Sequence, residues 1–295
     1  MGHAVRPKVS VIIITYNHED TIAACIESIV SQKFSSPFEI IIADDASNDG
    51  TAAIVRKYQT IYPDLIKPIL REKNIGPSLN FAGALKSCVG DYLAYCDGDD
   101  SWTKENKLTV AVEALDSNPD CTLFTHDTEL NDKTTNKKTP IVDQDWSRRL
   151  VNHRFTLLNS RYSHISGRVF RKMDFPDYGD TFMYCYLLSK GDGYYHDEIM
   201  SVYNYTGKGV WSQLSQEQQK NEHFKVYYKL TRASDFKYDD YYSQQVQGNI
   251  KSYKKYLGSK IGWYFFLRSK GIPSSEIKKI NLDLHLGSAG AKICK

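Results

Sequence analysis

Three carboxylates stand within four residues at the end of an apolar stretch of this chain. Residues 92–96 are mostly apolar, and Asp97, Asp99 and Asp100 follow at once, with Gly98 between the first two. This pattern is typical of a buried strand that carries acidic groups to its carboxyl end, where ligands bind in open α/β sheets. Because like charges so close together repel one another, we expect a cation among them, most simply a hard divalent metal. Taken alone, the same residues also suit an ordinary acidic turn.

Two further apolar runs also end in polar residues. Asp44 and Asp45 follow the run at residues 38–43, and the run at residues 9–15 leads into Tyr16 and Asn17. The carboxyl ends of parallel strands lie along one edge of a sheet, so these groups would converge on the acidic turn at residues 97–100. Such convergence favours a ligand site over separate turns.

Strand and helix patterns alternate along the first 125 residues. The predicted strands cover residues 9–15, 38–43, 65–70 and 92–97, and the predicted helices end near residues 31, 61, 88 and 117. This order predicts an α/β domain with a mostly parallel central sheet flanked by helices. Neither G-x-G-x-x-G nor G-x-x-x-x-G-K-[ST] occurs, so a bound phosphate would have to be held by metal and carboxylates.

The pattern changes in the second half of the chain. We predict strands at residues 121–126, 165–170 and 199–205, an exposed polar loop at 131–145, a helix at 180–189 and helical structure from residue 215 onward. Residues 251–295 carry ten lysines and arginines against two acids, around an aromatic run at 261–267. This composition suits an anionic membrane surface, and the alternative is a core-packing helix with a solvated basic face. No nucleic-acid-binding motif accompanies the charge, so we expect no nucleic acid partner.

The overall composition is that of a globular protein. The chain has 295 residues, of which 41% are hydrophobic and 25% charged, with a net charge of +3. The six cysteines have no zinc-ligand spacing, which predicts reduced thiols in a cytosolic protein. There is no signal-peptide pattern, and no stretch approaches the roughly eighteen apolar residues of a membrane span. We therefore expect a cytoplasmic protein, with peripheral contact to the inner face of the membrane as an option.

Four motifs, in this order and spacing, resemble those of the family 2 glycosyltransferases, which are inverting enzymes of the GT-A fold. They are Val-Ser-Val-Ile-Ile-Ile-Thr-Tyr-Asn at residues 9–17, Asp-Asp-Ala-Ser-Asn-Asp-Gly-Thr at 44–51, Asn-Ile-Gly at 74–76, and Gly-Asp-Tyr-Leu-Ala-Tyr-Cys-Asp-Gly-Asp-Asp-Ser-Trp at 90–102. The resemblance implies a GT-A domain over residues 1–213. Within it, residues 1–125 would bind the nucleotide and residues 126–213 would face the acceptor. Residues 214–295 would form a helical, basic C-terminal region.

The resemblance also assigns a donor site. Three residues would line the nucleotide pocket: Thr15, Tyr16 and Asn17. Asp45 would accept a hydrogen bond from the imide N–H of uracil or thymine, which a carboxylate acceptor suits. Asp97 would contact the ribose or the sugar. Asp99 would bind Mg²⁺ or Mn²⁺ at the diphosphate, with phosphate oxygens and water completing the coordination.

The resemblance places the catalytic base at Asp180, in a Gly-Asp pair at a predicted helix start. Such a base takes the proton of the acceptor hydroxyl as that oxygen attacks the anomeric carbon, and the alternative role is a helix N-cap. Residues 202–212 resemble a family segment that commonly begins Tyr-Arg and ends Gly-Val-Trp-Ser, but Asn204 replaces the usual Arg. Thr206 stands near the position of a usual His. The candidate acceptor or phosphate contacts are His126, His164, Lys208 and Trp211, although isolated histidines are more often structural.

The leading interpretation is a metal-dependent transferase. It would move a hexose or N-acetylhexosamine from a nucleotide-sugar donor, with uridine favoured and thymidine equally compatible with Asp45, to a glycan or lipid-linked acceptor. The expected setting is bacterial surface polysaccharide, such as lipopolysaccharide or capsule. One alternative is a sugar-phosphate nucleotidyltransferase, which normally has a Gly-rich, Arg-bearing loop where this chain has residues 16–19. The other is a binding scaffold that keeps the fold without turnover.

Overall fold

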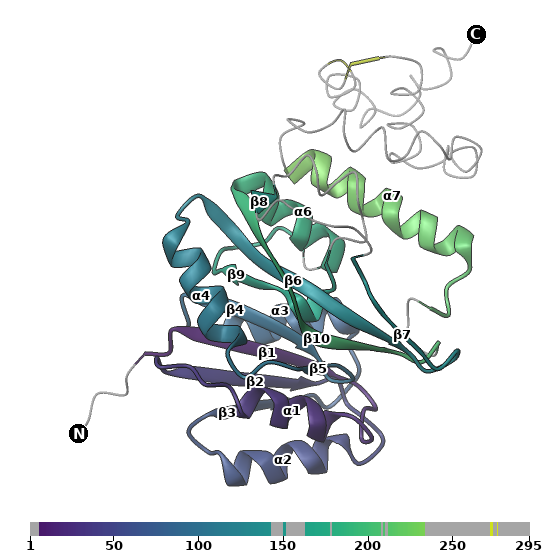
Figure 1. Ribbon diagram of the computed structural model, residues 1–295. Helices are drawn as coiled ribbons and strands as arrows, with labels where there is room; N and C mark the ends of the chain where they lie inside the picture. Colours follow the sequence, from purple (N-terminus) through teal and green to yellow (C-terminus); the bar gives the residue numbers. More distant parts are fainter. Residues whose placement is uncertain are drawn as a thin grey trace. The chain divides into compact units, whose positions relative to one another are not determined.

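The computed structural model describes residues 6–142, 150–151, 163–177, 179–207, 209, 212–233, 272–273 and 276. The chain divides into two compact units, Met1–Gln213 and Leu214–Lys295. In the first unit, ten strands form one sheet in the order β3-β2-β1-β4-β9-β6-β10-β5, with β7 beside β6 and β8 beside β10 (Figure 1). The first unit therefore contains the whole sheet and every element that positions the site.

Four parallel strands form one half of the sheet. They are β1 (Val9–Thr15), β2 (Phe38–Asp44), β3 (Ile66–Leu70) and β4 (Tyr92–Asp97). β1 pairs in parallel with both β2 and β4, and β2 pairs in parallel with β3. Ile12 and Ile13 are neighbours in β1 that point to opposite faces, and both are fully buried. Strands buried on both faces require such continuous apolar sequences, which is why β1, β2 and β4 are readable from the sequence.

Helices cover both faces of the sheet (Figure 1). They are α1 (Ile22–Val30), α2 (Thr51–Ile61), α3 (Pro77–Ser87), α4 (Lys107–Ser117) and α6 (Asp180–Lys190). Helices α1, α2 and α4 share a core with Val11 and Ile13, whereas α3 and α6 share a core with Ile12. Each fully buried isoleucine contributes roughly 1.5–3 kcal/mol. Packing on both faces therefore holds the strand ends, and the polar groups that follow them, in place.

The other half of the sheet has mixed strand directions. β9 (Val169–Arg171) runs antiparallel between β4 and β6 (Cys121–Asp132), and β10 (Asp192–Tyr205) lies parallel to β6. β5 (Ser101–Trp102) pairs antiparallel with β10, and β8 (Leu150–Val151) pairs antiparallel with the start of β10. Because β5 directly follows the acidic turn, its pairing brings β10 against that turn.

The prediction of a loop at residues 131–145 is wrong over its first part. β6 extends to Asp132, and β7 (Lys137–Pro140) pairs with it as an antiparallel hairpin. The Asp132 carboxylate accepts the N–H of Thr134, and Asn136 adopts a φ of 55°, which suits a tight turn. The hairpin was missed because all four residues of β7 are exposed and three of them are polar, so they lack the apolar alternation of a half-buried strand.

The prediction of a strand at residues 165–170 is also wrong at its start. Ile165–Gly167 form a 3₁₀ turn, η1, and β9 begins only at Val169. The N–H groups of Gly167 and Arg168 bond back to the carbonyls of His164 and Ile165. Ser166 and Gly167 favour such a turn over a strand. This change matters because η1 lies against the acidic turn.

The second unit is described mainly through α7 (Gln216–Ala233). Ser215 and Gln218 form a capping box, in which each side chain bonds the main-chain N–H of the other. The basic aromatic stretch at residues 251–295 lies outside the described residues except for 272–273 and 276. Within the described part of the chain, no helix combines the length and apolar character needed to cross a membrane. The five described cysteines are buried and have free thiols.

Candidate active site

The acidic turn folds back over the end of β1. The N–H of Gly98 donates to the carbonyl of Ile14, and the N–H of Asp100 donates to the carbonyl of Asp97, both at 3.0 Å. Thr21 holds the turn from α1, because its hydroxyl donates to the carbonyl of Gly98 at 3.1 Å. The turn is therefore bonded both to β1 and to the start of α1.

Gly98 is required at its position by close packing. A Cβ there would lie 2.7 Å from Oγ1 of Thr15 and 2.8 Å from Nδ1 of His18. We expect Gly98→Ala to lower the melting temperature by roughly 2–10 °C, because overpacking costs about 1–3 kcal/mol. Differential scanning fluorimetry measures this. The control is Gly209→Ala, whose Cβ would come no closer than 3.4 Å to Ser212. Equal melting temperatures for the two variants would contradict the packing argument.

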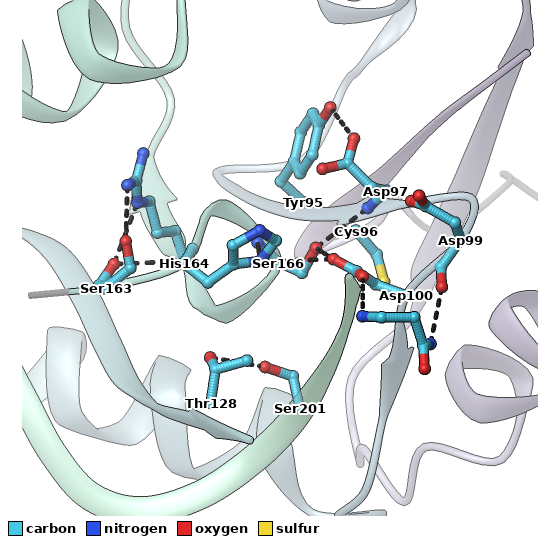
Figure 2. Close-up of polar contacts among 12 residues, drawn as sticks. Tyr95, Cys96, Asp97, Asp99, Asp100, Thr128, Ser163, His164, Ser166 and Ser201 are labelled. Carbon is cyan, nitrogen blue, oxygen red and sulfur yellow. Dashed lines mark hydrogen bonds and ion pairs between the residues drawn. The ribbon is translucent and has the colours of Figure 1, made fainter. Parts of the chain in front are cut away.

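The three carboxylates of the turn differ in exposure. The Asp99 side chain is 33% exposed, whereas that of Asp100 is fully buried. Oδ1 of Asp97 accepts the Tyr95 hydroxyl at 2.7 Å (Figure 2). Burial, followed by the negative charge of Asp99, raises the pKa of Asp97 to about 7. A nearby cation would remove this repulsion, so the electrostatics of the turn favour binding one.

The η1 turn brings His164 and Ser166 against the acidic turn (Figure 2). Oγ of Ser166 donates to Oδ2 of Asp100 at 2.5 Å and accepts the N–H of Asp97 at 3.1 Å. Nδ1 of His164 lies 3.3 Å from the same Asp100 oxygen. One atom each from Asp97, Asp100 and His164 lie within 4.8 Å of one another, which is close enough to share a metal ion. Burial lowers the pKa of His164 to about 4, so the imidazole is neutral, as a metal ligand must be.

A fully buried lysine anchors the η1 turn. Nζ of Lys107 donates to the carbonyl of Ser166 at 2.6 Å and lies 3.9 Å from the centre of the Trp102 ring. Nε1 of Trp102 donates to the same carbonyl at 3.1 Å. Burial lowers the pKa of Lys107 to about 7. Two donors on one carbonyl fix the turn and, with it, the position of His164.

Another two carboxylates, Asp44 and Asp45, lie at the end of β2, which is the neighbour of β1 on the side away from β4. The Asp45 carboxylate accepts the N–H groups of Ile75 at 2.9 Å and Gly76 at 2.8 Å. A carboxylate has about four acceptor sites, so two remain for a ligand. Asp44 is occupied differently, because it accepts the N–H and the hydroxyl of Ser47 within its own loop. Of the pair, Asp45 is the residue with acceptor capacity to spare.

The polar residues after β1 do not all face solvent. Thr15 is buried, and its hydroxyl lies 3.2 Å from Nδ1 of His18. Asn17, with a φ of 56°, joins two loops, since its side chain accepts the N–H of Asn48 and its own N–H donates to Ser47, both at 2.8 Å. Tyr16 is 41% exposed. Among the three predicted pocket residues, Tyr16 and Asn17 are exposed, whereas Thr15 is buried.

Asp180 is the first residue of α6, and Gly179 is the N-cap, so Asp180 does not act as the cap. Its side chain is 52% exposed and pairs with the buried guanidinium of Arg168. Arg168 also donates to Oγ of Ser163 at 3.1 Å and to the Ser163 carbonyl at 2.9 Å, which holds it rigidly. The negative charge of Asp180 contributes to the raised pKa of Asp97. The two carboxylates therefore belong to one electrostatic environment.

The remaining predicted contacts lie in different settings. His126 is fully buried in β6, and burial holds its pKa well below the ordinary range, so it offers no surface to an acceptor. His164 joins the acidic cluster, and its ring stacks on Tyr203 with centroids 4.1 Å apart. Lys208 and Trp211 lie outside the described residues. The sequence reasoning missed the roles of Ser166 and Arg168, although polar residues inside a supposed strand were an available signal.

Comparison with known proteins decides the family. The sequence model of the family described as Glycosyl transferase family 2 matches residues 10–179, more than half of the chain. The chain belongs to glycosyltransferase family 2. An uncharacterised protein of Mycobacterium tuberculosis is 32% identical to it over 220 residues, which cover 72% of this chain and 62% of that protein. This glycosyltransferase thus spans less than two thirds of the length of its mycobacterial relative.

Two solved structures share its fold. Staphylococcus aureus TarS (residues 1–349), in complex with UDP-GlcNAc, aligns with a TM-score of 0.58 and 18% identity over 95% of this chain and 92% of that one. The mannosyltransferase PcManGT of Pyrobaculum calidifontis, in complex with GDP-Man and Mn²⁺, aligns with a TM-score of 0.60 and 15% identity over 95% and 80%. At these identities the likeness concerns the fold alone, and it confirms the expected GT-A fold.

Proposed function

We propose that this glycosyltransferase moves a hexose or N-acetylhexosamine from a UDP-sugar to a hydroxyl of a glycan or lipid-linked acceptor, with inversion at the anomeric carbon. The proposed setting is the assembly of bacterial surface polysaccharide. The observation that carries the proposal is the convergence of Asp45, the acidic turn and Asp180 along the edge where the parallel strands end. Ligands bind at this edge in open α/β sheets.

Asp99 is the proposed principal metal ligand, because its side chain is 33% exposed whereas that of Asp100 is fully buried. Asp97, Asp100 and His164, which lie within 4.8 Å of one another, supply a further set of donors beside it in the acidic turn and the η1 turn. Carboxylate ligands with water and phosphate oxygens suit Mg²⁺ or Mn²⁺, and the Mn²⁺ bound to PcManGT supports a divalent metal. When bound, the metal would offset the charge that grows on the departing diphosphate.

Asp180 is the proposed catalytic base. Arg168 pairs with Oδ1 of its carboxylate, which leaves Oδ2 to take the proton of the acceptor hydroxyl. Holding the carboxylate in one direction aligns the attacking oxygen with the anomeric carbon, on the face opposite the leaving nucleotide. The 52% exposure of the side chain gives an acceptor room to approach.

The nucleotide base is proposed to contact Asp45 and Tyr16. Two acceptor sites of the Asp45 carboxylate remain for the imide N–H of uracil, and the exposed Tyr16 ring can pack on the base. The UDP-GlcNAc bound to TarS, a protein of the same fold, supports a uridine donor. We also propose that residues 251–295 make peripheral contact with the inner face of the cytoplasmic membrane, on the strength of their basic and aromatic composition.

A donor screen tests this proposal. UDP-glucose, UDP-galactose, UDP-GlcNAc, UDP-GalNAc, dTDP-glucose and GDP-mannose are each incubated with the protein and Mn²⁺, Mg²⁺ or EDTA. We expect at least one UDP-sugar to raise the melting temperature and to release UDP slowly, and EDTA to suppress both effects. Stabilisation without release under any condition would favour the scaffold. Release of pyrophosphate from UTP and a sugar phosphate would favour the nucleotidyltransferase.

A further inference from the structure

Two residues from outside the acidic turn contact Asp99. Nε2 of His18 lies 3.9 Å from Oδ2 of the Asp99 carboxylate. On the main-chain side, Nδ2 of Asn204 donates to the Asp99 carbonyl at 2.8 Å. His18 follows β1 and Asn204 stands near the end of β10, so the two contacts come from opposite halves of the sheet.

The His18 imidazole is held in place by its surroundings. Its Nδ1 lies 3.2 Å from Oγ1 of Thr15, and its main-chain N–H donates to Oγ1 of Thr51 at 2.8 Å. Gly98 leaves the space in which the ring packs against the turn. When the Thr15 hydroxyl donates to Nδ1, the ring proton is on Nε2, which faces Asp99. At 3.9 Å this is an electrostatic contact rather than a hydrogen bond, so it restrains the carboxylate without occupying its acceptor sites.

Asn204 ties β10 to the acidic turn at two points. Besides its bond to Asp99, its main-chain N–H donates to Oδ1 of Asp100 at 3.1 Å. Its Oδ1 accepts Nδ2 of Asn131 at 2.9 Å, which fixes the side-chain amide. Asn204 occupies the place where the family commonly has Arg, and its neutral amide adds no positive charge there. Its contribution is therefore to the geometry of the turn.

We propose that His18 and Asn204 form a bracket that holds Asp99 in position to bind a divalent cation. The bracket rests on the proposed function, because it requires the metal to bind at Asp99. His18 restrains the carboxylate and Asn204 restrains the main chain of the same residue, so together they limit its rotation. Removing a group that orients a metal ligand without touching the metal commonly lowers metal affinity by about 10- to 100-fold. We expect a loss of roughly that order here.

If His18 and Asn204 served only to stabilise the fold, replacing them would lower the melting temperature. The side chains of His18 and Asp99 are 26% and 33% exposed, so their contact is not needed to compensate a buried charge. Contacts between groups of this exposure contribute little to stability. Removing the His18 side chain should therefore leave the melting temperature almost unchanged and lower the affinity for metal.

The test measures Mn²⁺ binding to the full chain by electron paramagnetic resonance, with Mn²⁺ alone and with UDP added. We expect His18→Ala and Asn204→Ala each to raise the Mn²⁺ dissociation constant by about 10-fold or more. His18→Gln, which keeps a donor near Asp99, should recover part of the loss. Because His18→Gln preserves side-chain volume, it replaces His18→Ala in the binding measurement if His18→Ala does not fold. In the same way, Asn204→Ser replaces Asn204→Ala.

Matched controls come from the same chain. His196→Ala removes a histidine 3.5 Å from the Glu198 carboxylate, and Asn118→Ala removes a side-chain amide that donates to the Ala114 carbonyl. Both should bind Mn²⁺ as the parent does. If Asp99→Asn loses Mn²⁺ binding while either His18→Ala or Asn204→Ala stays within twofold of the parent, the bracket is overturned. If Asp99→Asn itself binds Mn²⁺ normally, the proposed metal assignment fails instead.

Discussion

Asp99→Asn lowers the rate of sugar transfer by about 10³-fold and removes metal-dependent UDP binding. The substitution keeps the shape of the side chain but removes the charge of a carboxylate that is 33% exposed. Loss of a ligand that stabilises charge on the diphosphate costs roughly 4 kcal/mol, which corresponds to about three powers of ten in rate. The measurements are the turnover number with saturating Mn²⁺ and isothermal titration of UDP with and without the metal.

The control for this prediction is Asp91→Asn. Asp91 directly precedes β4, and its side chain is 52% exposed in an ion pair with Arg6. Its loss should leave transfer and UDP binding unchanged, since surface ion pairs contribute about 0–1 kcal/mol. Near-normal turnover by Asp99→Asn, in a variant with parental melting temperature, would show that Asp99 does not hold the metal.

Asp180→Asn lowers the turnover number by about 10²- to 10⁴-fold and leaves metal-dependent UDP binding intact. An amide cannot take the proton of the acceptor hydroxyl, and a general base contributes about this factor. Donor binding is spared because the proposed donor contacts Asp45 and Asp99 follow strands β2 and β4, whereas Asp180 begins helix α6. Single-turnover kinetics with a preloaded UDP-sugar separates this defect in chemistry from a defect in binding.

Asp174→Asn is the matched control for the base, because Asp174 is an exposed carboxylate six residues upstream. It should transfer sugar at the parental rate. Equal losses in UDP affinity and turnover for Asp180→Asn would instead indicate that this residue supports the donor site. A third result, parental turnover, would move the catalytic base to another residue.

The sequence by itself determined the parallel half of the fold. Residues 9–15 and 38–43 are runs rich in β-branched residues, which are typical of strands buried on both faces, and they are β1 and β2 within one residue. The family also followed from local motifs, and the match to residues 10–179 confirms it. These features are readable because they depend on residues close together in the chain.

Only the tertiary structure decided how deeply each acidic residue is buried. The family resemblance gave Asp97 and Asp99 different roles, but the pairing of β5 with β10 and the η1 turn are what bury Asp100 against Ser166 and leave the Asp99 side chain 33% exposed. These contacts join residues 66 positions or more apart, and no local pattern encodes them.

The partners of the proposed base Asp180 and the proposed metal ligand Asp99 are also far from them in the sequence or brought to them by strand pairing. Arg168 meets Asp180 because β9 runs antiparallel beside β4, and Asn204 meets Asp99 because β10 extends along β6 past the acidic turn. Burial and charge pairing depend on what packs nearby in space, so the exposure of Asp99, the neutral state of His164 and the restraint on Asp180 become known only when the sheet is assembled.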